Sequence, residues 1–206
     1  FTYYVPHNIK DLIYLIGGNE AFVTKLNQQF ELASQDNFIS KHGEHAHNWI
    51  DYENQPSLHM AHLFSDAGAP WLTQYWVRRI KKEVFGDITP FGGYNGDEDQ
   101  GQMGALGVLM AIGLFDVQGG ASTTPQYEIT SPIFDKITIQ LDNRYYPGKE
   151  VVIETVNNSP KNVYIQRVSW NGVEHSSFQL AHEELVKGGH LVIELGDTPN
   201  KSWGVN

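Results

Sequence analysis

Three consecutive carboxylates, Asp97, Glu98 and Asp99, form the segment of the chain with the clearest potential for chemistry. They lie between Gly96 and Gly101, where a glycine-marked loop meets an apolar run. Adjacent acids repel one another and are costly to desolvate, so crowding them gives a fold no advantage. Such a cluster is typical of a site that binds a cation, polarises water or contacts sugar hydroxyls. For an isolated motif, a solvated acidic loop with a helix cap explains the pattern equally well.

The composition of the 206-residue chain narrows the classes of function. A formal net charge of −10 disfavours a surface that follows nucleic-acid phosphates, and the basic residues gather only in the short run 78–82. Cysteine is absent, which excludes thiol catalysis and cysteine-ligated zinc. No run of 18 apolar residues exists, so no membrane span is predicted. Aromatic residues are frequent, as in many carbohydrate-binding proteins, although aromatics also fill cores.

Helical periodicity extends to about residue 118 and must position the acidic loop. After a candidate N-cap at Asn19, one apolar stripe consists of Phe22, Leu26, Phe30 and Ala33. Further helices are predicted over 58–66, from Pro70 to about 84, and over 100–115. The intervening loops, 36–57 and 86–96, have a length that is commonly functional.

The period changes from helical to alternating after Gly119-Gly120. Runs rich in β-branched residues cover 135–141, 151–156, 162–170 and 190–195. Asn171-Gly172 is a strong hairpin-turn signal between two of the strands. The sequence therefore predicts an α+β chain, with a helical domain over 1–120 and an antiparallel β module over 121–206.

Ordered segments along the whole chain resemble one enzyme family. They are Tyr4-Val5-Pro6-His7-Asn8, Glu53-Asn54-Gln55-Pro56 with His59, Gly68-Ala69-Pro70-Trp71-Leu72-Thr73-Gln74, Gly96-Asp97-Glu98-Asp99-Gln100-Gly101-Gln102-Met103, Ser131-Pro132-Ile133-Phe134, and Pro199-Asn200-Lys201-Ser202-Trp203-Gly204. In this order they resemble the C-terminal part of glycoside hydrolase family 92, the calcium-dependent exo-α-mannosidases. Any one of the segments alone would be a weak signal.

The resemblance implies an architecture larger than this chain. Residues 1–120 would be the last helices of an (α/α)6 toroid, and residues 121–206 would pack on an N-terminal β-sandwich. That sandwich, the first toroid helices and the general acid would belong to the rest of the polypeptide, so the chain is expected to be a fragment that lacks the general acid. The family resemblance also implies a bacterial protein that is periplasmic, cell-surface or secreted.

The activity implied by the resemblance is hydrolysis of terminal α-linked mannose, α-1,2-linked by expectation, from oligosaccharides such as N-glycans. The mechanism would be inverting and dependent on Ca²⁺, an ion that accepts many oxygen ligands in loose geometry. Asp97 and Asp99 match the position of the general base. Asn54 and Gln55 fall on the metal-binding segment, where Gln55 replaces a glutamate found in many members. Glu53 is expected to contact the leaving-group sugar.

Three further residues are candidate substrate contacts. His7 follows a proline in one of the matching segments and is expected to line the pocket. Trp49 and Tyr94 are aromatic residues of the long loops and are candidates for stacking on sugar.

The other histidines favour structural interpretations. The histidine-rich stretch 42–47 is interpreted as solvated surface, because transition-metal sites require fixed ligand spacing. His59 and His62 lie three apart on one predicted helix and are expected to be core or interface residues rather than ligands.

Two other functions remain open on sequence alone. The chain could be a non-catalytic, calcium-dependent carbohydrate-binding fragment, or its β half could be a structural brace. What separates them from an enzyme is whether an acid outside the chain faces Asp97 and Asp99 at the distance that inversion requires.

Overall fold

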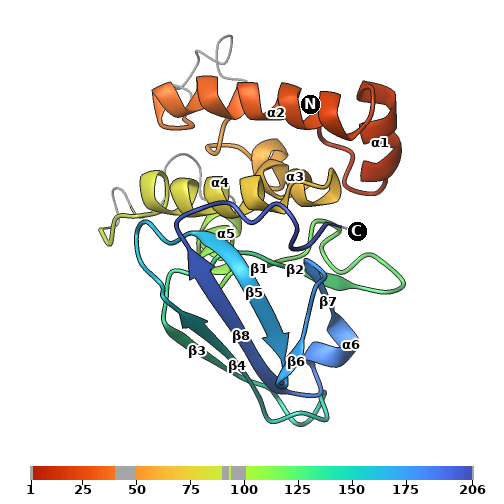
Figure 1. Ribbon diagram of the computed structural model, residues 1–206, viewed down its shortest axis with the longest axis vertical. Helices are drawn as coiled ribbons and strands as arrows, with labels where there is room; N and C mark the ends of the chain where they lie inside the picture. Colours follow the sequence, from red (N-terminus) through yellow and green to blue (C-terminus); the bar gives the residue numbers. More distant parts are fainter. Residues whose placement is uncertain (1, 40–49, 90–92, 94–100, 206) are drawn as a thin grey trace.

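The computed structural model describes residues 2–39, 50–89, 93 and 101–205. Its helices are stacked at one end of the molecule and its strands at the other, as Figure 1 shows. The helical half contains α1 (Ile9–Ile16), α2 (Asn19–Ala33), α3 (Leu63–Asp66), α4 (Pro70–Glu83) and α5 (Gln102–Ile112), with 3-10 turns at Ser34–Asp36, Gln55–Ser57 and Met60–His62. The strand half contains β1 (Leu114–Phe115), β2 (Gln126–Ile129), β3 (Lys136–Gln140), β4 (Glu150–Val156), β5 (Tyr164–Trp170), β6 (Val173–Glu174), β7 (Gln179–Ala181) and β8 (Gly189–Gly196), with the short helix α6 (His182–Leu185). The α+β prediction is confirmed.

The predicted stripe on α2 is buried, as its spacing requires. Phe22, Leu26 and Phe30 are fully inaccessible to solvent, and the helix begins at Asn19 itself, one residue after its cap at Gly18. Helix α1 has no counterpart among the predicted elements. Asn8 caps its first turn, and the Asn8 side chain accepts a hydrogen bond from the Asp11 amide at 3.2 Å.

The predicted helix over 58–66 is broken, which corrects the sequence interpretation. Two short 3-10 turns precede the four-residue α3. Two backbone amides in this segment donate to side-chain hydroxyls from elsewhere in the fold. Ala61 N–H donates to the Tyr52 hydroxyl at 3.3 Å, and Ser65 N–H donates to Thr73 Oγ1 at 3.2 Å. Because these acceptors satisfy the backbone, a regular helix is not needed.

Helix α5 ends at Ile112, earlier than the predicted residue 115. Gly113 caps it with φ +75°, and a Cβ at this position would lie 2.7 Å from Pro132 Cγ. Glycine is therefore required both for the left-handed turn and for the close approach of Pro132. The next residues, Leu114 and Phe115, pair with β2 as a short strand.

The strands form a five-stranded sheet in the order β3-β4-β8-β5-β6 and a three-stranded sheet in the order β1-β2-β7. All pairs are antiparallel except β4 and β8, which run parallel from Val151↔Gly189 to Val156↔Glu194. The antiparallel β module predicted from sequence therefore contains one parallel pair that was not predicted. The chain passes through β5, β6, β7 and α6 between β4 and β8, and a crossover of that length permits parallel pairing.

The β5–β6 hairpin confirms the predicted turn. Asn171 and Gly172 have φ values of +51° and +78°, the left-handed pair that a tight hairpin turn needs. Asparagine and glycine adopt these angles at the lowest steric cost.

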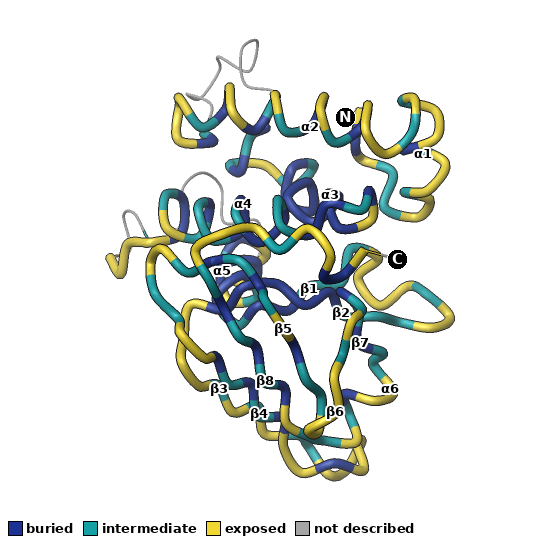
Figure 2. Tube along the Cα trace, in the orientation of Figure 1, coloured by how far each residue is buried: buried dark blue, intermediate teal, exposed yellow. Residues whose placement is uncertain are grey.

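Two hydrophobic cores lie on either side of the joint between the halves, and both are visible as buried segments in Figure 2. Large aromatic side chains fill the helical core, with Phe30 at its centre, 5.2 Å from Trp76 and 5.4 Å from Phe64 between ring centroids. The sheet core consists mainly of aliphatic residues, among them Ile153 of β4 and Ile193 of β8. Their alternation along each strand is the pattern from which the strands were predicted.

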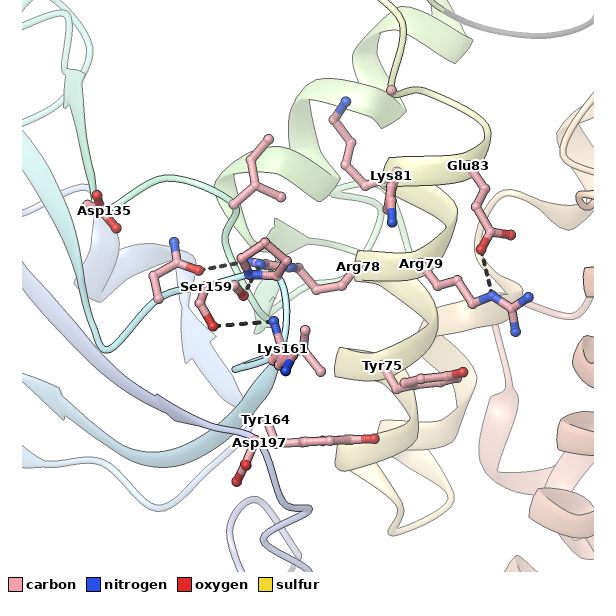
Figure 3. A pocket seen from close by; sticks show the side chains of 16 residues that line it. Tyr75, Arg78, Arg79, Lys81, Glu83, Asp135, Ser159, Lys161, Tyr164 and Asp197 are labelled. Carbon is pink, nitrogen blue, oxygen red and sulfur yellow. Dashed lines mark hydrogen bonds and ion pairs between the residues drawn. The ribbon is translucent and has the colours of Figure 1, made fainter.

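Helix α4 joins the two halves through polar contacts. Gln74 Oε1 accepts a hydrogen bond from the Ile165 amide at 2.8 Å, at an irregularity in the β5–β8 pairing. Arg78 donates to the carbonyl oxygens of Pro132 and Ser159 and to Asn158 Oδ1. Figure 3 shows Arg78 extending from α4 toward the loop that carries Ser159.

Candidate functional site

A cavity of about 420 Å³ brings together segments that are far apart in the sequence. Tyr4 and Pro6 form one wall, and Gln55, Leu58 and His59 form another. Helix α5 contributes its first residue, Gln102, with Ala105, Leu106 and Leu109, and the strand-to-loop segment 115–119 completes the cavity. Its wall thus combines amides, an aromatic ring and aliphatic surface, the mixture typical of small-ligand sites.

The predicted metal-binding segment lies at this cavity. Gln55 is half-buried on its wall, whereas the neighbouring Asn54 is exposed. Glu53 is half-buried; its amide donates to Asp51 Oδ1 at 2.9 Å, and its Oε2 is buried without a hydrogen-bond partner among the described residues. A buried carboxylate oxygen in this state is a site where a donor or a cation would be stabilising.

The predicted substrate contact His7 is exposed. Its neighbours Tyr4 and Pro6 line the cavity. The predicted role of His7 stays a prediction.

The predicted base residues Asp97 and Asp99 lie outside the described residues, as do Trp49, Tyr94 and the histidine-rich stretch 42–47. Gln102, three positions after Asp99, is on the cavity wall and comes from the same acidic segment of the sequence. Sequence reasoning did not single out Gln102 or Tyr4, although both belong to segments on which the family resemblance rests. Their position within those segments was the signal that could have identified them.

His59 and His62 are both buried, as predicted for core or interface residues. His59 Nε2 lies 2.8 Å from the Tyr3 carbonyl oxygen. Burial, with a smaller effect from the charge of His62, holds the pKa of His59 below its ordinary value. His62 Nδ1 hydrogen-bonds Glu128 Oε2, and its ring stacks on Phe115 with centroids 3.9 Å apart.

A smaller cavity of about 220 Å³ adjoins this histidine pair and has Asp66, Asp116 and Glu128 on its wall. Asp66 is exposed and belongs to the wall of this cavity. Desolvation, together with the negative charge of Glu128, raises the pKa of Asp66 to about 7. Within the described ranges, no three acidic or histidine side chains are arranged to hold a metal ion.

A larger cavity, about 950 Å³, lies between α4 and the loop around Ser159 and is shown in Figure 3. Its wall carries more basic than acidic side chains, and Arg79 pairs there with Glu83 at 2.8 Å. None of the predicted site residues that the structure describes lies on this wall. Size alone therefore does not identify the functional site, and the 420 Å³ cavity is the better candidate.

Residues 1–197 match the family described as "Glycosyl hydrolase family 92 catalytic domain". The chain belongs to glycosyl hydrolase family 92. The matched range includes both the helical half and most of the strand half. The resemblance first inferred from short motifs is thereby confirmed.

Solved family 92 structures share the fold over nearly the whole chain. A family GH92 α-mannosidase from Bacteroides thetaiotaomicron superposes with a TM-score of 0.82 at 27% identity, covering 99% of this chain and 25% of its own. A GH92 inverting mannosidase from the same organism gives a TM-score of 0.81 at 31% identity, covering 100% and 28%. An uncharacterized secreted glycosidase of Arthroderma benhamiae is 31% identical over 204 residues, which are 98% of this chain and 23% of the relative. The chain thus spans about a quarter of the length of these relatives.

The oxygen donors around the 420 Å³ cavity fit the calcium ion that the family resemblance implies. Gln55 and Gln102 offer amide oxygens and Asp116 a carboxylate, all on the described wall. The partnerless Glu53 Oε2 is two residues from Gln55. Calcium prefers such hard oxygen ligands and tolerates irregular geometry. Since the described residues alone form no metal cluster, further ligands would have to come from elsewhere.

Proposed function

We propose that this family 92 chain forms part of an enzyme that hydrolyses terminal α-linked mannose. The observation that carries the proposal is the convergence of Tyr4, Gln55 and Gln102, from three family-like segments, on one cavity. Two structural neighbours are described as mannosidases, and one of them has been solved in complex with mannoimidazole. α-1,2-Linked mannose of N-glycans is the substrate proposed from the family resemblance.

The proposed mechanism inverts the anomeric centre. Asp97 or Asp99 would remove a proton from the attacking water, and a general acid outside this chain would protonate the leaving oxygen. In inverting enzymes the two carboxyl groups are about 6.5–9.5 Å apart, which leaves room for the water. One structural neighbour is described as an inverting mannosidase.

Asn54 and Gln55 would hold calcium, with Gln102 as a further amide donor at the same cavity. When bound, the ion would polarise sugar hydroxyls and favour ring distortion toward the transition state. Glu53, close to this segment, would contact the leaving-group sugar. The polypeptide would act outside the cytoplasm, in line with a relative described as a secreted glycosidase. Within the described residues, no helix has the length and apolar character to cross a bilayer.

An alternative is calcium-dependent carbohydrate binding without catalysis. What supports it is that the aromatic ring and the amides of the cavity suit sugar binding, whereas the proposed mechanism takes its general acid from outside this chain. The cavity and its amides would then bind sugar but not cleave it.

The test is a comparison of Asp97→Asn and Asp99→Asn in the full polypeptide on an α-linked mannoside. Asparagine is nearly isosteric and removes the proton acceptor, so turnover is expected to fall roughly 100-fold or more while inhibitor affinity changes far less. Asp142→Asn, an exposed loop carboxylate distant in sequence, is the matched control and should leave turnover unchanged. Chelation should weaken binding and turnover together, and added calcium should restore both.

The proposal for the base fails if both asparagine variants keep near-normal turnover while chelation abolishes it. The two aspartates would then be metal ligands or structural residues. Sugar binding that survives in a polypeptide without turnover would favour the non-catalytic alternative.

A further inference from the structure

Tyr4 is a half-exposed aromatic residue on the wall of the 420 Å³ cavity. About half of the residue's surface is accessible (52%), although the adjacent Tyr3 is buried at 3%. Across the cavity, Ala105 and Leu109 of α5 offer aliphatic surface, while Gln55 and Gln102 offer amides. An aromatic ring can pack against the C–H face of a pyranose while amides bind its hydroxyls.

His59 contacts Tyr4 and its backbone at the same time. The imidazole packs edge-on against the Tyr4 ring, with centroids 5.5 Å apart and planes at 71°. Its Nε2 lies 2.8 Å from the Tyr3 carbonyl oxygen, which also accepts the Val5 amide at 2.9 Å. Because a carbonyl oxygen can only accept, Nε2 must carry the proton and donate. The His59 imidazole therefore holds the backbone turn before Tyr4 and restricts the orientation of the Tyr4 ring.

This contact joins two distant parts of the chain at the candidate site. His59 follows Gln55 by one helical turn, and both line the cavity. The bond to Tyr3 spans 56 positions of sequence and is buried. The position of the Tyr4 ring is therefore tied to the segment that carries the proposed metal ligands.

We propose that Tyr4 is a stacking platform for the sugar ring and that His59 is the residue that positions it. The inference takes the sugar as ligand from the proposed function. It adds roles for Tyr4 and His59 that do not follow from the proposed base or the proposed metal ligands. Tyr4 acts by direct contact, and His59 acts through Tyr4.

The first test replaces the ring in the full polypeptide. Tyr4→Ala is expected to raise the KM for an α-linked mannoside, and the Kd for methyl α-mannopyranoside, roughly three- to tenfold, with a smaller change in kcat. Tyr4→Phe should keep most of the affinity because it retains the ring. Tyr14→Ala, which removes an even more exposed tyrosine on α1, is the control and should change neither constant. A Tyr4→Ala variant with unchanged KM and Kd would overturn the assignment.

The second test separates positioning from mere packing. The amide nitrogen of His59→Gln can reach the place of Nε2 and keep the bond to the Tyr3 carbonyl, so affinity should be largely retained. The shorter His59→Asn cannot, and its KM should rise as far as that of Tyr4→Ala. If His59 acts through Tyr4, the double variant His59→Asn/Tyr4→Ala should be no worse than either single variant. Additive effects, or equal losses in the Gln and Asn variants, would overturn the positioning role.

Failure of the proposed activity gives a different result. Should the polypeptide bind methyl α-mannopyranoside in a Tyr4-dependent way without cleaving mannosides, the hydrolase proposal fails and this inference stands. Should it cleave mannosides with a KM that the Tyr4 and His59 substitutions leave unchanged, the hydrolase proposal stands and this inference fails.

Discussion

Replacing Arg78 by methionine should weaken the joint between the helical and strand halves more than any surface charge would. The guanidinium lies on α4 and donates to three acceptors of the strand half, with 3.0 Å to Asn158 Oδ1 and 2.8 Å to the Ser159 carbonyl. Burial lowers the pKa of Arg78, yet arginine stays charged, so its N–H groups remain donors to these three acceptors. Methionine keeps the aliphatic stem and removes every donor.

The magnitude follows from the number of hydrogen bonds lost. A net contribution of about 1 kcal/mol for each bond gives a loss of about 3 kcal/mol in the free energy of unfolding. Water in the adjoining 950 Å³ cavity can hydrogen-bond the carbonyl groups that Arg78 releases. The loss therefore does not include the larger cost of leaving a buried acceptor without a partner. Arg78→Lys keeps the positive charge but not the planar set of guanidinium donors, so the decrease in the free energy of unfolding should be intermediate.

Urea unfolding followed by tryptophan fluorescence measures this loss, because the chain has five tryptophans. Arg167→Met is the matched control: its Nη2 lies 2.8 Å from Glu194 Oε2, but the arginine side chain is 70% exposed. An exposed pair of this kind contributes less than about 1 kcal/mol. If Arg78→Met were no more destabilising than Arg167→Met, the account of α4 as the joint would be refuted.

Three other predictions concern individual polar and charged side chains. Gln74→Leu should lower the free energy of unfolding by roughly 1–3 kcal/mol in the same urea assay, because the buried Ile165 amide loses its acceptor. The pKa of Asp66 is raised to about 7 from 3.8, so the folded state binds the extra proton and stability should fall as pH rises from about 4 to about 7; Asp66→Asn should flatten that part of a pH–stability curve, and an unchanged slope would contradict the assignment. Glu128→Gln should lower the pKa of Asp66 in an NMR titration, since it removes the neighbouring negative charge; a pKa that stays near 7 would leave desolvation as the sole cause.

Much of the secondary structure was predictable because it depends on local periodicity. The stripe from Phe22 to Ala33 allowed α2 to be predicted, and Pro70 marks the first residue of α4 as expected. The alternating runs became β3, β4, β5 and β8, and the Asn171-Gly172 turn depends only on the steric freedom of those two residues. Short strands such as β1 and β7 were missed, because a strand of two or three residues is too short to show a detectable alternation.

The candidate site was predictable only in part. Asn54, Gln55 and Glu53 were selected through a resemblance of motifs, and Gln55 does line the cavity. The base residues Asp97 and Asp99 lie outside the described residues and stay predictions. Tyr4 and His59 could have been identified only by their positions within the family-like segments, because neither residue type by itself indicates a binding role.

The sequence by itself determined the family, the helical and strand halves and the segments that carry polar side chains, because motifs and hydrophobic periods are properties of neighbouring residues. Only the tertiary structure decided which distant groups meet. The hydroxyls of Tyr52 and Thr73 accept hydrogen bonds from backbone amides that would otherwise continue a helix. Strand β8 pairs parallel with β4, and His59 hydrogen-bonds the turn before Tyr4. Each of these contacts joins groups from separate elements, and packing of the whole chain selects among the partners that each segment alone would permit.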